Sequence, residues 1–136
     1  MNPLSPFDAN MRLLSKSLDL RAENQKVIGS NIANAETPGY APARFSFEEE
    51  LSSAIKGTAT PLATTHPGHI PLGPHSVGSV SGMLIREPDQ TGIGDENGVS
   101  VEEEMLALTE NELLYETSAQ LLKKKMTLMK FVIAGE

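Results

Sequence analysis

A helix stop signal at residues 31–40 divides this chain into two parts with different patterns. A long amphipathic pattern runs into the segment, and beyond it the helical periodicity ends. Pro38 biases the backbone of Thr37 away from the helical region, and Gly39 tolerates the positive φ that the third position of a type II turn requires. We therefore expect a first helix that ends near Asn34 and a chain that turns directly afterwards.

The residues before this signal, 6–34, alternate apolar spacings of four and three, which is typical of a helix with a heptad seam. The predicted seam consists of Phe7, Met11, Leu14, Leu18, Arg21, Gln25, Ile28 and Ile32. A second apolar stripe consists of Leu13, Leu20 and Val27. Between the two stripes lie the small polar residues Asn10, Ser17, Asn24 and Asn31. Because this apolar arc is wider than a two-stranded seam requires, the helix is expected to have neighbours on two sides.

The C-terminal end of the chain has the same design. Ser100 and Glu103 have the spacing of a capping box, which predicts a helix that begins there and continues to about Ile133. Its predicted seam consists of Val101, Met105, Leu108, Glu112, Tyr115, Ala119, Leu122, Met126, Met129 and Ile133. The second stripe consists of Ala107, Leu114, Leu121 and Leu128, with Asn111 and Ser118 between the stripes.

The middle of the chain is rich in Pro, Gly, Ser and Thr. Acidic residues and apolar spacing predict a short helix near 46–56, with Phe45 and Phe47 packed on the main helices. Frequent prolines predict that residues 57–82 are extended or disordered, and a brief strand is expected from residue 83.

The predicted fold class is therefore mainly α, with two long terminal amphipathic helices that form an antiparallel coiled-coil hairpin around a partly disordered middle with little β structure. The expected organisation is an N-terminal helix and signature in 1–40, a flexible arm in 41–99, and a C-terminal helix in 100–136. In the antiparallel alignment that matches the two seams throughout, Arg21 lies opposite Glu112. A pair of this kind would favour one register, because breaking a buried pair leaves an uncompensated charge.

Composition restricts the function classes. The 136 residues are 39% hydrophobic and contain no tryptophan, which argues against a large three-layer core. The net charge of −7 and the missing basic stripe argue against nucleic acid as a partner. No apolar run approaches the roughly 20 residues that span a bilayer, so direct lipid insertion is not expected. The N-terminus lacks the basic and apolar regions of a secretory signal peptide, and we expect no cleaved leader.

The sequence offers weak candidates for catalysis or metal binding. His66, His69 and His75 could in principle bind zinc, but the Pro-rich backbone around them favours exposed loop histidines. The acidic runs 48–50 and 102–104 stand where helices begin, and acidic residues are favoured there by the helix dipole. We therefore expect no enzyme activity, no cofactor and no metal site.

The stop signal itself resembles the N-terminal signature of bacterial flagellar axial proteins, the rod and hook subunits. The matching residues are Asn31, Ile32, Ala33, Asn34, Thr37, Pro38, Gly39 and Tyr40. Among these subunits the chain is most similar to the short proximal rod proteins, which often carry Asp where this chain has Glu36. The resemblance extends over residues 18–51, 65–70 and 95–133, and residues 71–94 lie outside it.

This resemblance implies a structural subunit of the proximal rod of the flagellar basal body. Such a subunit passes through the flagellar type III export apparatus without cleavage. It then assembles with copies of itself and other rod and export-gate proteins into a helical tube, which connects the export gate and MS ring to the outer rod for motility. Two alternatives remain open from the residues: a soluble helical-hairpin adaptor that binds a partner helix, and an enzyme such as a peptidoglycan hydrolase, which would need a preformed cleft.

Overall fold

The computed structural model describes residues 9–56, 76–86 and 98–135. In this part of the chain the elements are α1 (Ala9–Ala33), β1 (Ala43–Ser46), α2 (Glu48–Lys56), the 3-10 turn η1 (Val77–Ser79), β2 (Met83–Arg86) and α3 (Val101–Ala134). The described residues are therefore mainly helical with little strand, and the two long helices lie at the two ends of the chain, as predicted.

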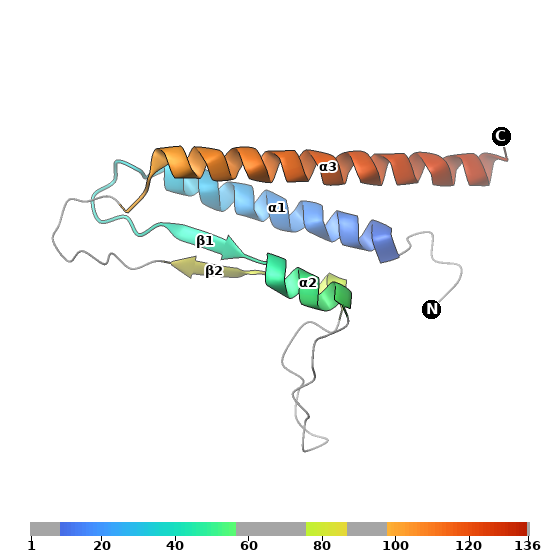
Figure 1. Ribbon diagram of the computed structural model, residues 1–136, viewed down its shortest axis with the longest axis horizontal. Helices are drawn as coiled ribbons and strands as arrows, with labels where there is room; N and C mark the ends of the chain where they lie inside the picture. Colours follow the sequence, from blue (N-terminus) through green and yellow to red (C-terminus); the bar gives the residue numbers. More distant parts are fainter. Residues whose placement is uncertain (1–8, 57–75, 87–97, 136) are drawn as a thin grey trace, which may run out of the picture.

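The elements are stacked so that α1 lies in the middle. Figure 1 shows α3 along one side of α1 and the two-stranded β1–β2 sheet with α2 on the other side. The helices α1 and α3 run in opposite directions (Figure 1). Because α1 contacts α3, β1 and η1, it has neighbours on two sides, which is what its wide apolar arc predicts.

Local signals determine where the helices begin and end. α1 ends at Ala33, where the Asn34 side-chain amide donates to the Ser30 carbonyl at 2.8 Å. α3 begins after Ser100, whose hydroxyl accepts from the Glu103 backbone N–H at 3.4 Å. It closes at Gly135, which has a φ of 68° and donates its N–H to the Phe131 carbonyl. Gly is favoured at such a left-handed cap because it has no Cβ.

The small sheet joins two segments that are far apart in the sequence. β1 and β2 pair antiparallel, with Phe45 opposite Leu84 and Ala43 opposite Arg86. The brief strand predicted from residue 83 is confirmed as β2, which ends at Arg86. β1 was not predicted, because the sequence pattern around Phe45 and Phe47 indicated only a helix or an ordered arm. Its ladder partner lies about forty residues later in the chain.

A small core lies between α1 and the segments that carry Phe47 and Val80. Its fully buried members are Leu20 of α1, Phe47 and Val80, with Leu51 and Ala54 of α2 packed against them. The Phe47 prediction is confirmed, because its side chain is 2% exposed and packs against α1. Val80 is 0% exposed, and burial of its side chain against Leu20 and Phe47 orders a segment that the proline spacing predicted to be extended or disordered. The prediction for residues 57–75 lies outside the described residues.

Candidate assembly site

The Asn31 side chain holds the chain reversal together. It is 1% exposed, and its amide nitrogen donates to the Ala43 carbonyl at 2.8 Å while its oxygen accepts from the Ala43 N–H at 3.0 Å. The carboxamide therefore takes the place of a neighbouring strand and satisfies both backbone groups at the start of β1. The Tyr40 hydroxyl donates to the same Asn31 oxygen at 3.2 Å. We call Asn31, Tyr40 and Ala43 the clasp.

The segment between the helix end and the clasp is a tight turn. The Tyr40 N–H donates to the Thr37 carbonyl at 3.2 Å, and Gly39 has a φ of +69°, as predicted for this turn. The Thr37 hydroxyl donates to the Asn34 side-chain oxygen at 3.3 Å. Pro38 and Gly39 are exposed on the outside of the turn. The signature residues 31–40 thus combine a buried polar anchor with an exposed loop tip.

The two asparagines near the end of α1 have different roles. Short polar side chains in the last turn of a helix can cap its free carbonyls. Asn34 does so, but Asn31 points away from the helix end toward β1. The reason is the direction of the chain after the turn, which brings the Ala43 backbone within reach of the Asn31 amide.

A second polar contact joins α1 to α3. Asn111 is 3% exposed, and its amide nitrogen donates to the Arg21 carbonyl at 2.9 Å while its oxygen accepts from the Asn24 amide at 3.1 Å. The Arg21 guanidinium also lies 3.5 Å from this oxygen. Asn24 and Asn111 belong to the small polar rows between the apolar stripes. These rows therefore face each other across the helix pair.

This arrangement corrects the predicted pairing of Arg21 with Glu112. The guanidinium lies 3.6 Å from the Glu48 carboxylate and 5.4 Å from the centre of the Phe47 ring. Glu112 instead accepts a hydrogen bond from the Gln25 side chain at 3.4 Å. The prediction was wrong because it aligned only the two long helices. Arg21 instead meets Glu48 at the start of α2, an element that the alignment of α1 with α3 did not consider. Arg21 therefore connects α1 to the β1–α2 corner.

The predicted seam residues are covered on α1 but not equally on α3. Met11 and Ile28 are buried, and Leu14, Leu18, Arg21 and Ile32 are partly buried. On α3 the partly buried seam residues are Leu108, Ala119, Leu122 and Met129. The exposed seam residues on α3 are Val101, Met105, Glu112, Tyr115, Met126 and Ile133. α3 is thus rotated so that Asn111 faces α1, and Phe7 lies outside the described residues.

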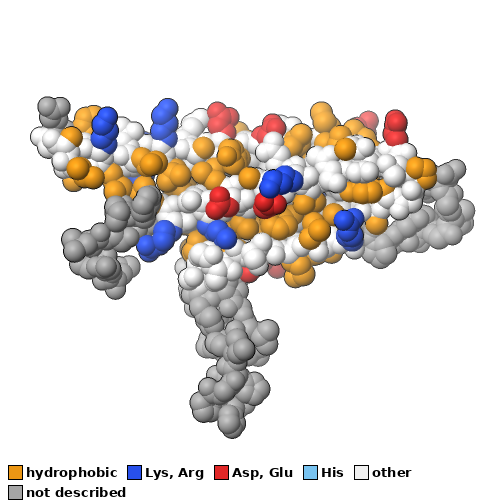
Figure 2. Space-filling view, turned by 180° about the vertical axis from the view of Figure 1, so that it is seen from behind, with side chains coloured by type: hydrophobic (Ala, Val, Ile, Leu, Met, Phe, Trp, Pro, Cys, Tyr) orange, Lys and Arg blue, Asp and Glu red, His pale blue; other side chains and the backbone are white. Residues whose placement is uncertain are grey.

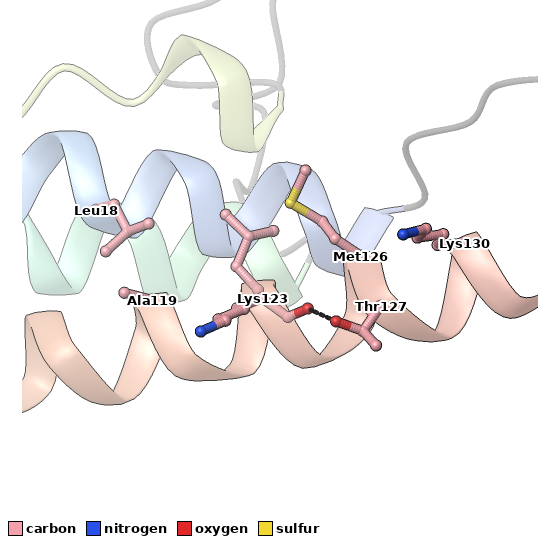
Figure 3. Close-up of a pocket in the computed structure, with 7 residues that line it drawn as sticks. Leu18, Ala119, Lys123, Met126, Thr127 and Lys130 are labelled. Atoms are coloured by element: carbon pink, nitrogen blue, oxygen red, sulfur yellow. Dashed lines mark hydrogen bonds between the residues drawn. The ribbon is translucent and has the colours of Figure 1, made fainter.

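An open groove of about 480 Å³ separates part of α1 from α3 near the start of α1. Figure 3 shows Leu18 from α1 on one side and Ala119, Lys123 and Met126 from α3 on the other. The small Ala119 side chain opposite Leu18 leaves this space. Met11 of α1 and Leu122 and Met126 of α3 line a neighbouring cavity.

The described residues contain no group of three His, Asp or Glu side chains placed to hold a metal ion. The three histidines, His66, His69 and His75, lie outside the described residues. Within the described part of the chain no helix is both long enough and apolar enough to traverse a bilayer.

The sequence analysis did not predict the hydrogen-bond partners of the buried residues Asn31 and Asn111, although the sequence contains one signal that they are buried. Asn24, Asn31 and Asn111 lie in rows of small polar residues at heptad spacing, flanked by apolar stripes. An Asn flanked on both sides by buried apolar residues is often buried itself and hydrogen-bonded. That pattern could have identified Asn31 and Asn111 as inward-facing, but not Ala43 or Arg21 as their partners.

The comparisons with known proteins agree with this signature. Residues 11–40 match the family model described as flagella basal body rod protein. The flagellar basal body rod protein FlgB of Salmonella typhimurium is 33% identical over 139 residues, which cover 97% of this chain and 98% of the relative. FlgB of Aeromonas hydrophila is 32% identical, with 96% of each chain covered. FlgB of Cereibacter sphaeroides is 33% identical, with 98% of this chain and 100% of the relative covered.

The similarity is not limited to the signature, since these relatives align along nearly the whole chain and include both terminal helices. The region that the family model matches contains most of α1, the turn at Gly39, and Asn31 and Tyr40 of the clasp. The chain therefore belongs to the FlgB family of flagellar basal body rod proteins.

Proposed function

We propose that this chain is a structural subunit of the proximal rod, which polymerises with copies of itself and with other rod proteins into a helical tube. The tube connects the export gate and MS ring to the outer rod. We extend the proposal to export of the subunit through the flagellar type III apparatus. The chain acts in this proposal as a building element and not as an enzyme.

The observation that carries the proposal is the unequal coverage of the two long helices. α1 is packed on two sides, whereas α3 packs on α1 along one side. The large hydrophobic side chains exposed on α3 are Val101, Met105, Leu106, Leu113, Leu114, Tyr115, Leu121, Met126, Leu128, Phe131, Val132 and Ile133. Figure 2 shows hydrophobic side chains open to the surface among charged ones. Exposed apolar surface of this extent marks an interaction site, and a heterologous contact that does not close produces a filament.

Within the assembled rod, we propose that α1 and α3 form an antiparallel coiled-coil hairpin. The opposite directions of the helices and the cavity that Met11 and Leu122 both line support this arrangement. The exposed part of the predicted seam on α3 is then available to a neighbouring subunit.

The signature residues serve assembly in this proposal by redirecting the chain out of the helix pair. Gly39→Val places a β-branched side chain at positive φ, which costs on the order of 1–2 kcal/mol per subunit. We expect this variant to be secreted but not to build rods. Gly29→Val is the control, because Gly29 is helical, has no positive φ, and has no atom within 4 Å of an added Cβ. Normal rods in the Gly39→Val strain would contradict the role of the turn.

The proposed function is tested by deleting the protein and examining basal bodies by electron cryotomography. We expect cells that retain the export gate and MS ring but lack the rod, and we expect the wild-type chain to restore it. The alternative, a soluble adaptor that binds a partner helix, predicts rods of normal structure with altered export or timing. Rods in the deletion strain would therefore exclude the structural role.

A further inference from the structure

The charges of α3 are divided between its two halves. The first half carries the acidic residues Glu102, Glu103, Glu104, Glu110, Glu112 and Glu116 and no Lys or Arg. Residues 121–134 carry Lys123, Lys124, Lys125 and Lys130 and no acidic residue. Along the upper edge of Figure 2, blue side chains gather toward the left end and red ones lie farther to the right.

The spacing of these charges matches the spacing of the apolar stripe. Lys124 follows Glu110 by fourteen residues. Leu128 likewise follows Leu114 by fourteen residues. Fourteen residues are two heptads, so each pair lies on nearly the same side of the helix. A shift of two heptads therefore brings opposite charges together and superimposes the apolar stripe on itself.

The residues involved are accessible. Leu114 is 36% exposed and Leu128 is 58% exposed. The side chains of Glu110 and Lys124 are also exposed. In the described part of the chain, ion pairs join Arg21 to Glu48 and Lys26 to Glu23, both away from this face.

We propose that two copies of this chain pack their α3 helices side by side and parallel, displaced by two heptads, or about 21 Å along the helix axis. The acidic half of one copy then contacts the lysine half of the next copy. Leu114 of one α3 packs near Leu128 of its neighbour, and Glu110, one turn before Leu114, lies beside Lys124, one turn before Leu128. This inference rests on the proposed function and specifies the contact between subunits.

An antiparallel pair of α3 helices would also match opposite charges, but it would form a closed dimer. The staggered parallel arrangement leaves one half of each α3 free for a further copy and therefore continues indefinitely. The unstaggered parallel arrangement is disfavoured, because it places the acidic halves of the two helices against each other and the lysine halves against each other.

Cysteine cross-linking tests the stagger directly, because the chain contains no native cysteine. The double variant Leu114→Cys/Leu128→Cys, expressed in cells as the sole copy and oxidised, should give a ladder of dimers, trimers and larger species on a non-reducing gel. The single variants Leu114→Cys and Leu128→Cys are the matched controls and should give no ladder. Dimers from either single variant, or no ladder from the double variant in motile cells, would overturn the stagger.

Charge reversal tests the pairing. Glu110→Lys and Lys124→Glu, each introduced into the double-cysteine chain, should reduce the ladder about threefold on its own. Co-expression of the two should restore it, because each acidic half again meets a lysine half. A ladder unchanged by either variant would overturn the charge pairing. Motility of the double-cysteine strain before oxidation shows whether rods are built at all. Motile cells that give no cross-linked ladder would contradict the stagger but leave the proposed structural role intact.

Discussion

Replacing Asn31 by Asp is the sharpest test of the clasp. The change keeps the size of the side chain and the oxygen that accepts from the Ala43 N–H and the Tyr40 hydroxyl. It removes the amide donor that lies 2.8 Å from the Ala43 carbonyl and puts a second carboxylate oxygen there. Because the side chain is 1% exposed, the new charge is buried beside a carbonyl oxygen without a donor. We expect a loss of about 3–5 kcal/mol in the free energy of unfolding, the typical cost of an uncompensated buried charge.

Asn34→Asp provides the matched control. Asn34 also donates its amide to a carbonyl at 2.8 Å, that of Ser30, but it does so in the exposed turn, where water replaces the lost donor. We expect this control to cost about 1 kcal/mol, from the lost hydrogen bond and a negative charge at the end of α1.

Urea unfolding followed by circular dichroism measures both variants, and hydrogen exchange at the Ala43 amide reports on the clasp itself. For a chain of this size, with a slope of about 1–2 kcal/mol per molar urea, the Asn31→Asp midpoint should fall by roughly 1.5–5 M relative to wild type. Exchange at Ala43 should accelerate more than exchange in the middle of α3. Equal midpoints for Asn31→Asp and Asn34→Asp would refute the argument that the buried two-point contact stabilises the chain reversal.

Three further changes test other contacts by the same unfolding assay. Gly82→Ala should cost about 2–4 kcal/mol, because an added Cβ at a φ of +69° would lie 2.4 Å from the Phe45 ring. The control Gly39→Ala has the same φ but no atom within 4 Å of the added Cβ, and it should cost only about 1 kcal/mol. Equal costs would mean that the Phe45 ring moves freely. Val80→Ala should cost about 1–3 kcal/mol by leaving a cavity in the core, and a change within 0.5 kcal/mol would indicate that the core does not hold the segment around η1. Glu48→Gln should cost less than about 1 kcal/mol, because the Glu48 side chain is 71% exposed in its pair with Arg21, and a larger loss would show that water screens this pair less than its exposure implies.

The sequence by itself determined the features that depend on neighbouring residues. Pro38 and Gly39 ended α1 and set the turn, since their backbone preferences act without distant partners. Ser100 marked the beginning of α3 because a side-chain cap acts within one turn of helix. The heptad stripes likewise predicted two long helices with more apolar surface than one partner covers.

Only the tertiary structure decided which residues meet across the chain. β1 has four residues, too few for a clear local pattern, and it depends on pairing with β2 across a long sequence separation. Several carboxylates in the sequence could have paired with Arg21. Its ion pair with Glu48 forms because α2 begins at Glu48 directly after β1, which packs on α1. The inward rotation of Asn111 follows from hydrogen bonds to α1 that a single-helix pattern does not contain. A pattern along one helix defines its faces, but the partner of each face is determined by long-range packing and by the hydrogen bonds that burial requires.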